Sequence, residues 1–97
     1  MRSARGRASR EEAELLAVAA LSFLADDPER LGRFLAETGL EPEGLRSAAG
    51  TPGFLPAVLD HLIGNESLLL DFAVDRGIDP ATIPAARAAL PGARRDY

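Results

Sequence analysis

The sequence predicts an all-α fold of six short helices, built as two duplicated three-helix units that pack into one compact orthogonal bundle. Three observations predict it. No segment sustains the alternation of apolar and polar residues that is typical of a strand. Helix-capping residues recur at short intervals along the chain. The 97 residues are 46% hydrophobic, which is enough for one small core.

The first two helices have the clearest predicted boundaries. Ser9 and Glu12 have the spacing of a capping box, which predicts a helix over residues 10–25. The Asp-Pro pair at 27–28 is typical of an N-cap followed by the first helical residue, and this second helix is expected to end at Gly39. The apolar spacing predicts a core face on the first helix made of Leu16, Ala20, Phe23 and Leu24, with Val18 and Leu21 beside them.

Four shorter helices follow, each bounded by proline, glycine or a capping side chain. Their expected starts are Glu41-Pro42, Thr51-Pro52, Asn65 and Asp79-Pro80, and their expected ends are Gly50, Gly64, Gly77 and Pro91. The predicted core stripe of the fourth helix is Leu55, Val58, Leu59, Leu62 and Ile63. Pro56 and Pro84 each lie four residues into a predicted helix, where each is expected to remove one backbone hydrogen bond.

An internal repeat connects the two halves of the chain. A shift of 38 residues aligns Leu31 with Leu69, Phe34 with Phe72, Gly39 with Gly77, and Pro42 with Pro80. Caps, core positions and breaks agree together, which predicts two copies of one unit over residues 12–50 and 51–90. Because neither copy could bury enough surface alone, we expect both to form a single domain over residues 10–92.

Charge is unevenly distributed. Residues 1–10 contain four arginines and no acidic residue, whereas residues 11–90 contain 14 acidic residues and five arginines. We expect a disordered basic arm over residues 1–9 and a disordered tail over residues 93–97. The arm has two interpretations: a solvated chain start, or a segment that attracts nucleic acid or anionic lipid.

The apolar run over residues 15–25 is not expected to be a signal peptide or a membrane span. Three glutamates separate it from the arginines of the arm, and no credible cleavage site follows it. It is also much shorter than the roughly 20 residues that cross a bilayer. We therefore expect a cytoplasmic protein without a membrane span.

The fifth predicted helix is apolar on nearly all sides, in the run SLLLDFAV, which is typical of a central helix. Leu68 and Leu70 stand where the other copy has Arg30 and Gly32. Two interpretations remain open for these leucines: they pack against the first helix, or they form an exposed patch that binds a partner or a second copy. Leu68 and Leu70 are therefore the candidate protein interface.

The segment FAVDRGIDPATIPAARAAL resembles the helix-turn-helix of bacterial repressors in its spacing of Ala73, Gly77, Ile78, Ile83 and Ala86. Base edges are read mainly by Arg, Lys, Asn and Gln, and its second helix offers only Arg87. The same spacing is typical of any tight helix corner. A nucleic-acid function remains the alternative, with Arg2, Arg5, Arg7, Arg10 and Arg87 as candidate contacts.

Catalytic chemistry finds little support in the composition. The chain has one histidine, no cysteine and no lysine, which excludes most pairs of nucleophile and base. His61 directly follows Asp60, so their side chains diverge by about 100° on a helix and cannot pair. We expect His61 to pack like an aromatic residue, because the repeat aligns it with Phe23. No catalytic residue, metal ligand or cofactor is predicted.

Three longer stretches resemble a family of small all-helical alphaproteobacterial proteins of about 90–100 residues that has no established activity. They are ALSFLADDPERLGRFLAETGLEPEGLR, PGFLPAVLDHLIGNESLLLDFA and GIDPATIPAARAALPG, and the resemblance covers residues 9–92. Pro56 and His61 depart from the pattern of that family. The resemblance implies a helical cytoplasmic protein and transfers no functional residue.

These observations predict a non-enzymatic module that acts by binding an unknown protein partner or by self-association. The alternative is a nucleic-acid-associated regulator that combines the basic arm with degenerate helix-turn-helix corners.

Overall fold

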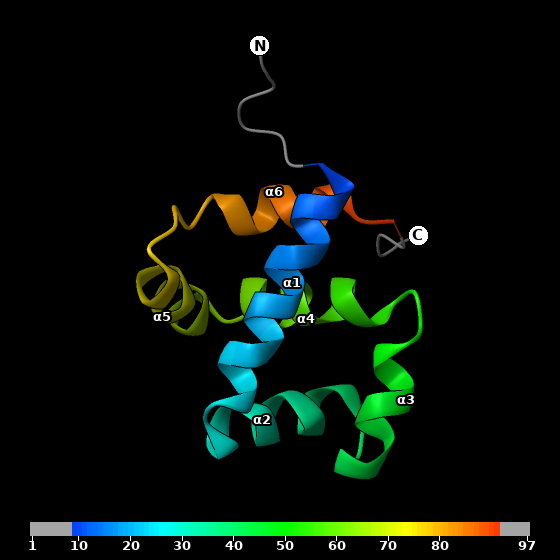
Figure 1. Cartoon of the computed structure of the whole chain (residues 1–97). Helices are drawn as coiled ribbons and strands as arrows, with labels where there is room; N and C mark the ends of the chain where they lie inside the picture. The colour runs from blue at the N-terminus through cyan, green and yellow to red at the C-terminus, as the bar shows by residue number, and fades with distance from the viewer. Residues whose placement is uncertain (1–8, 92–97) are drawn as a thin grey trace.

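The computed structural model describes residues 9–91 and places them in six α-helices and one 3-10 turn (Figure 1). The elements are α1 (Arg10–Ala25), α2 (Pro28–Thr38), η1 (Pro42–Gly44), α3 (Leu45–Ala49), α4 (Phe54–Ile63), α5 (Glu66–Arg76) and α6 (Thr82–Ala89). No strand occurs within 9–91, so the predicted all-α fold is confirmed. Except for Ser9, the predicted arm lies outside the described residues, and so does the predicted tail.

Three helices form the centre of the fold. α1 packs most extensively against α6 and α4, and α4 also packs against α6. α2 packs against α1, whereas α3 and α5 pack against α4. Figure 1 shows α1 crossing in front of α4, with α2 at one end of the molecule and α6 at the other. The largest side chains of the core, all fully buried, are Phe34, Phe72, Leu24, Leu59, Leu62, Ile83 and Val58.

The predicted capping interactions of the first two helices are present. Ser9 Oγ accepts a hydrogen bond from the Glu12 backbone N–H at 3.0 Å, and Glu12 Oε1 accepts from the Ser9 N–H at 3.1 Å. Asp27 Oδ1 accepts from the Glu29 N–H at 2.9 Å. The capping box and the Asp-Pro start are therefore confirmed, and the first two helices begin where the sequence predicts.

The corners after α2 and α5 share one geometry. Gly39 and Gly77 adopt left-handed backbone conformations with φ of 77° and 67°, which glycine tolerates best. The residue after each glycine donates its N–H to a carbonyl five residues back, at 3.1 Å in the first corner and 2.9 Å in the second. The helices beyond the two corners differ, because α3 buries none of its residues whereas α6 contributes Ile83 and Ala86 to the core. The internal duplication itself stays a prediction.

Two helices begin later than predicted, and proline explains why. α4 starts at Phe54 and α6 at Thr82, so Pro56 and Pro84 are the third residues of their helices. The first turn of a helix has no intrahelical partners for its N–H groups. The expectation that each proline removes a backbone bond was therefore wrong. The ladder begins at the next residue in each helix, with N···O distances of 3.2 Å in α4 and 3.4 Å in α6.

The position of α5 also differs from the prediction. α5 lies at the edge of the molecule in Figure 1 and buries only Leu68, Phe72 and Ala73, so the expectation of a central helix was wrong. Leu70 is 43% exposed and Val74 is 82% exposed. The central helix is α1 instead.

Candidate functional site

The first part of α1 buries small side chains and exposes two larger apolar ones, whereas its last turn buries Phe23 and Leu24. Ala13, Ala17 and Ala20 are fully buried on its inner face, where alanine allows neighbouring helices to approach closely. Leu15 is 70% exposed and Val18 is 48% exposed on the other face. The sequence placed Val18 beside the core face, and the structure corrects this. Single exposed apolar side chains are common on protein surfaces. Whether Leu15 and Val18 indicate a binding site therefore depends on the residues around them.

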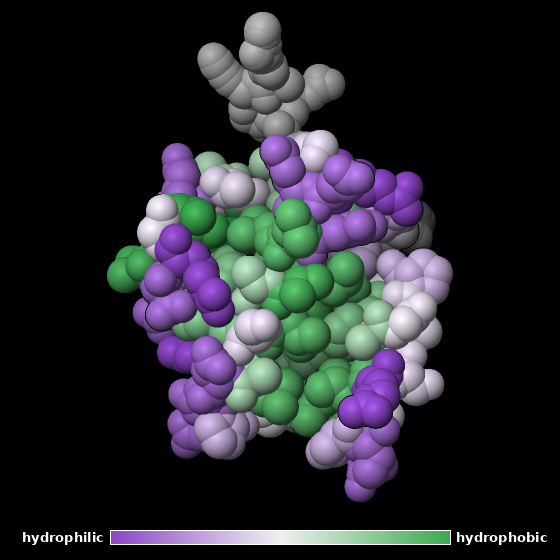
Figure 2. All heavy atoms as spheres, viewed as in Figure 1, coloured by the Kyte–Doolittle hydropathy of each residue, from purple (hydrophilic) through white to green (hydrophobic). Residues whose placement is uncertain are grey.

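Leu15 and Val18 belong to a larger apolar surface. Together with Leu55 of α4 they line an open groove of about 390 Å³, with Glu11 and Glu14 as its acidic residues. Figure 2 shows apolar side chains gathered in the middle of this face, where α1 lies in Figure 1. We call this surface the α1 groove.

A second hollow of about 150 Å³ adjoins the α1 groove. Glu14 and Leu55 line both, and the second hollow adds Pro52, Pro56 and Leu90 among its apolar residues. The start of α4 and the end of α6 therefore extend the surface that begins on α1. An apolar surface shared by three helices and bordered by carboxylates has the character of a protein-binding site.

The two leucines predicted as an interface lie in different environments. Leu68 is only 9% exposed and belongs to the hydrophobic core, whereas Leu70 is at the surface. Val74 lies one turn after Leu70, so the two form a small exposed apolar pair on α5. Of the predicted pair, only Leu70 is available to a partner.

The candidate nucleic-acid contacts are not brought together among the described residues. Arg87 is 9% exposed, and its Nε donates to Asp60 Oδ1 at 2.8 Å. Arg10 pairs with Glu14 at 3.6 Å in an exposed i,i+4 ion pair on α1. The other three, Arg2, Arg5 and Arg7, lie outside the described residues.

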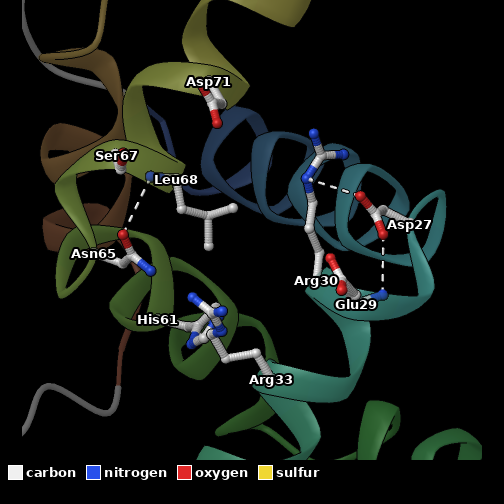
Figure 3. A pocket seen from close by; sticks show the side chains of 9 residues that line it. All are labelled: Asp27, Glu29, Arg30, Arg33, His61, Asn65, Ser67, Leu68 and Asp71. Carbon is white, nitrogen blue, oxygen red and sulfur yellow. Dashed lines mark hydrogen bonds and ion pairs between the residues drawn. The ribbon is translucent and has the colours of Figure 1, made fainter.

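A polar hollow of about 340 Å³ lies between the starts of α2 and α5 and the last turn of α4 (Figure 3). Its lining residues are Asp27, Glu29, Arg30, Arg33, His61, Asn65, Ser67, Leu68 and Asp71. Arg30 is held in place, because its guanidinium lies 4.0 Å from the centre of the Phe23 ring and its Nε is 3.9 Å from Asp27 Oδ2. The Arg33 side chain makes no hydrogen bond or ion pair within the described part of the chain.

His61 makes a contact that the sequence did not reveal. Its Nδ1 lies 2.8 Å from Glu37 Oε1, and its ring packs edge-on against Phe34 with a centroid distance of 5.2 Å. The aromatic packing matches the predicted role of His61. The carboxylate partner comes from α2, 24 residues earlier, so no spacing within one helix could have indicated it. Within residues 9–91, no three acidic or histidine side chains are grouped to hold a metal ion.

Residues 10–93 match a family model described as a protein of unknown function (DUF3572). The chain belongs to this family. No curated protein and no solved structure matches the chain. The matched range agrees with the extent of the resemblance predicted over residues 9–92, while the alphaproteobacterial origin stays a prediction.

Membership of DUF3572 does not assign functional residues, so the geometry has to identify them. The described residues of this DUF3572 protein contain no helix that is both long and apolar enough to cross a membrane. They contain two candidate binding sites with no lining residue in common: the apolar α1 groove and the polar hollow around His61.

Proposed function

We propose that this DUF3572 protein is a non-enzymatic module that binds another protein through the α1 groove. The observation that carries the proposal is the orientation of α1, whose alanines face the core while Leu15 and Val18 face outward beside Leu55. Full burial of a leucine or valine side chain contributes about 1.5–3 kcal/mol. Two such side chains in one groove can therefore anchor a partner.

The partner that fits this groove is an amphipathic helix with basic residues along its edge. Helices bind apolar grooves through residues spaced three and four apart, and the groove offers such a surface along α1. Glu11 supplies negative charge at its border beside the Arg10–Glu14 ion pair, which favours arginine or lysine on the partner. A second copy of the chain fits less well, because each copy carries a net charge of −4.

The nucleic-acid alternative gains no support from Arg10 and Arg87, the two candidate contacts that lie among the described residues. Phosphate contacts need cations that are free to reach the backbone. Arg87 is buried against Asp60, and Arg10 is paired with Glu14. The protein-binding function is therefore the one that the geometry favours. The cytoplasmic location expected from the sequence stays a prediction.

Site-specific photocrosslinking tests the proposal. A photoreactive amino acid replaces Leu15 in one variant and Val74 in another, because both side chains are apolar and highly exposed but lie on different helices. Crosslinking takes place in the native cells, and mass spectrometry identifies the adducts. We expect an adduct with one defined protein from position 15 and none from position 74.

Affinity measurements with the purified adduct partner complete the test. We expect Leu15→Asp to weaken binding by at least about tenfold, since it removes one buried anchor and adds a repelling charge. Glu11→Arg should slow association and reverse its salt dependence. Equal adducts at both positions, or unchanged affinity of the Leu15→Asp variant, would reject the α1 groove. An adduct between two copies of the chain would reject the basic helical partner in favour of self-association.

A further inference from the structure

His61 carries a buried nitrogen with unused hydrogen-bonding capacity. The imidazole is 2% exposed, and its Nε2 has no hydrogen-bond partner within the described part of the chain. A carboxylate can only accept hydrogen bonds, so the Nδ1 that faces Glu37 carries a proton. An unpaired buried ring nitrogen costs free energy in a folded protein, and this one belongs to a residue that lines the polar hollow.

The hollow that His61 lines contains donor side chains as well as the carboxylates of Asp27, Glu29 and Asp71. Arg33 lines the same hollow, and Figure 3 shows its side chain extending from α2 toward the side where His61 lies. Asn65 accepts a hydrogen bond from the Leu68 N–H at 3.3 Å through Oδ1, which leaves its amide nitrogen to donate. Asn65 also begins α5, an 11-residue helix whose first N–H groups favour an anion.

We propose that the polar hollow binds a carboxylate group of a ligand between the Arg33 guanidinium and His61 Nε2. In the complex His61 is an imidazolium that donates from Nε2 to the ligand, while Glu37 accepts from Nδ1 and stabilises the positive charge. Arg33 and a carboxylate form a planar pair with two parallel hydrogen bonds. The ligand thus satisfies the buried nitrogen.

The remaining charges of the hollow limit the ligand to a single negative charge. Asp27 is paired with Arg30 and accepts a hydrogen bond from the Glu29 N–H, so the Asp27 and Arg30 side chains together contribute little net charge to the hollow. Glu29 and Asp71 are both exposed carboxylates that also line the hollow. They repel a dianion such as phosphate more strongly than a carboxylate, which selects the singly charged group. This site shares no lining residue with the α1 groove.

Nuclear magnetic resonance of the full chain labelled with ¹⁵N tests the proposal, because the only histidine gives an unambiguous imidazole signal. The probe is sodium acetate, with sodium chloride at matched ionic strength as the reference. We expect saturable shifts of the His61 Nε2 and Arg33 Nε signals with acetate alone. Arg33→Gln should weaken acetate binding roughly tenfold. Arg46→Gln, an exposed arginine on α3, is the matched control and should leave it unchanged.

A second variant separates binding from structure. Glu37→Gln keeps an oxygen that can accept from Nδ1 but removes the charge, so the fold should persist while acetate binding weakens. Shifts no larger than those with sodium chloride would overturn the proposal, and so would equal effects of Arg33→Gln and Arg46→Gln. Tighter binding of inorganic phosphate than of acetate would overturn the single-charge requirement.

The source of the carboxylate is found with short peptides. A tetrapeptide with a free carboxyl terminus is compared with the same peptide carrying a carboxamide. Binding of the free peptide alone assigns the hollow to the chain terminus of a protein. Binding of acetate without either peptide assigns it to a small carboxylic acid. Both results support a carboxylate site, whereas equal binding of the two peptides would contradict it.

Discussion

α1 and α5 each contain a long apolar run, yet one is the centre of the fold and the other is its edge. α1 buries Ala13, Ala17, Ala20, Phe23 and Leu24, whereas α5 buries Leu68, Phe72 and Ala73. Small side chains on the inner face of α1 allow close approach of its neighbours α4 and α6. The comparison shows that the arrangement of small and large side chains, rather than the amount of apolar sequence, decides which helix is central.

The same arrangement determines what each helix leaves exposed. With alanines inward, α1 directs Leu15 and Val18 to the surface, and α4 and α6 extend this surface into a groove. α5 leaves Leu70 and Val74 exposed, and neither lines any of the three hollows described above. This difference is the reason for placing the partner on α1 rather than at the leucines that the sequence singled out.

The largest expected effect comes from the anchor of α5. Phe72 is fully buried and lies 5.3 Å from the Phe23 ring of α1, centre to centre. We expect Phe72→Ala to lower the free energy of unfolding by about 3–5 kcal/mol, measured by urea denaturation. Val74→Ala, at an exposed position on the same helix, should change it by less than about 0.5 kcal/mol. Equal losses would mean that α5 is not anchored through one face.

Replacing a buried alanine of α1 with a larger residue should destabilise the protein. Ala17 is fully buried, so Ala17→Leu should destabilise the fold by about 1–3 kcal/mol through overpacking. Val18→Leu adds a methylene on the outward face of the same helix and should leave stability nearly unchanged. Thermal unfolding of the two variants compares the faces directly. A tolerated leucine at position 17 would show that close approach does not make α1 central.

Adding a side chain should lower the stability of the protein at Gly77, in the corner after α5, but not at Gly32 within α2. Gly77 has φ of 67°, so Gly77→Ala is expected to cost about 1 kcal/mol. Gly32 lies within α2 with open space around its Cα, and Gly32→Ala should stabilise by about 0.5–1 kcal/mol. Opposite signs in urea denaturation are expected, and a loss of stability at both positions would contradict the explanation.

The smallest effect on stability is expected at the proposed interface. Leu15→Ser combined with Val18→Ser should change the free energy of unfolding by less than about 0.5 kcal/mol per residue, since both side chains are largely exposed. Solubility should rise, which light scattering measures. A large loss of stability would show that these side chains support the fold and would remove the basis for a partner site.

Local sequence signals predicted the local structure well. The Ser9–Glu12 box, the Asp27 cap and the glycine corners depend on residues within a few positions of each other, and each is present. The late starts of α4 and α6 were missed because the sequence favours Pro52 and Pro80 as the first residues of these helices. In the structure each helix starts two residues before a later proline, Pro56 or Pro84, which lies in its first turn.

Features that depend on packing could not be predicted in this way. Periodicity correctly predicted Ala20, Phe23 and Leu24 on the core face of α1, but it missed Ala13 and Ala17, whose burial depends on the packing against α4 and α6. The His61–Glu37 contact joins α4 to α2 and has no signal within either helix. Both candidate sites arise from such contacts between helices, which explains why sequence reasoning found neither.

The packing of α1 against α6 has a consequence for the biosynthesis of the protein. α1 leaves the ribosome before the other described helices, and its main neighbour α6 (Thr82–Ala89) is the last of them to be made. At roughly 5–20 residues per second, translation separates the two helices by a delay on the order of seconds. During that interval the inner face of α1 lacks the contacts of α6, while the Leu15–Val18 face is exposed as it is in the folded protein. The nascent chain therefore passes through a stage in which α1 exposes more apolar surface than it does in the folded protein. Synthesis of α6 ends that stage.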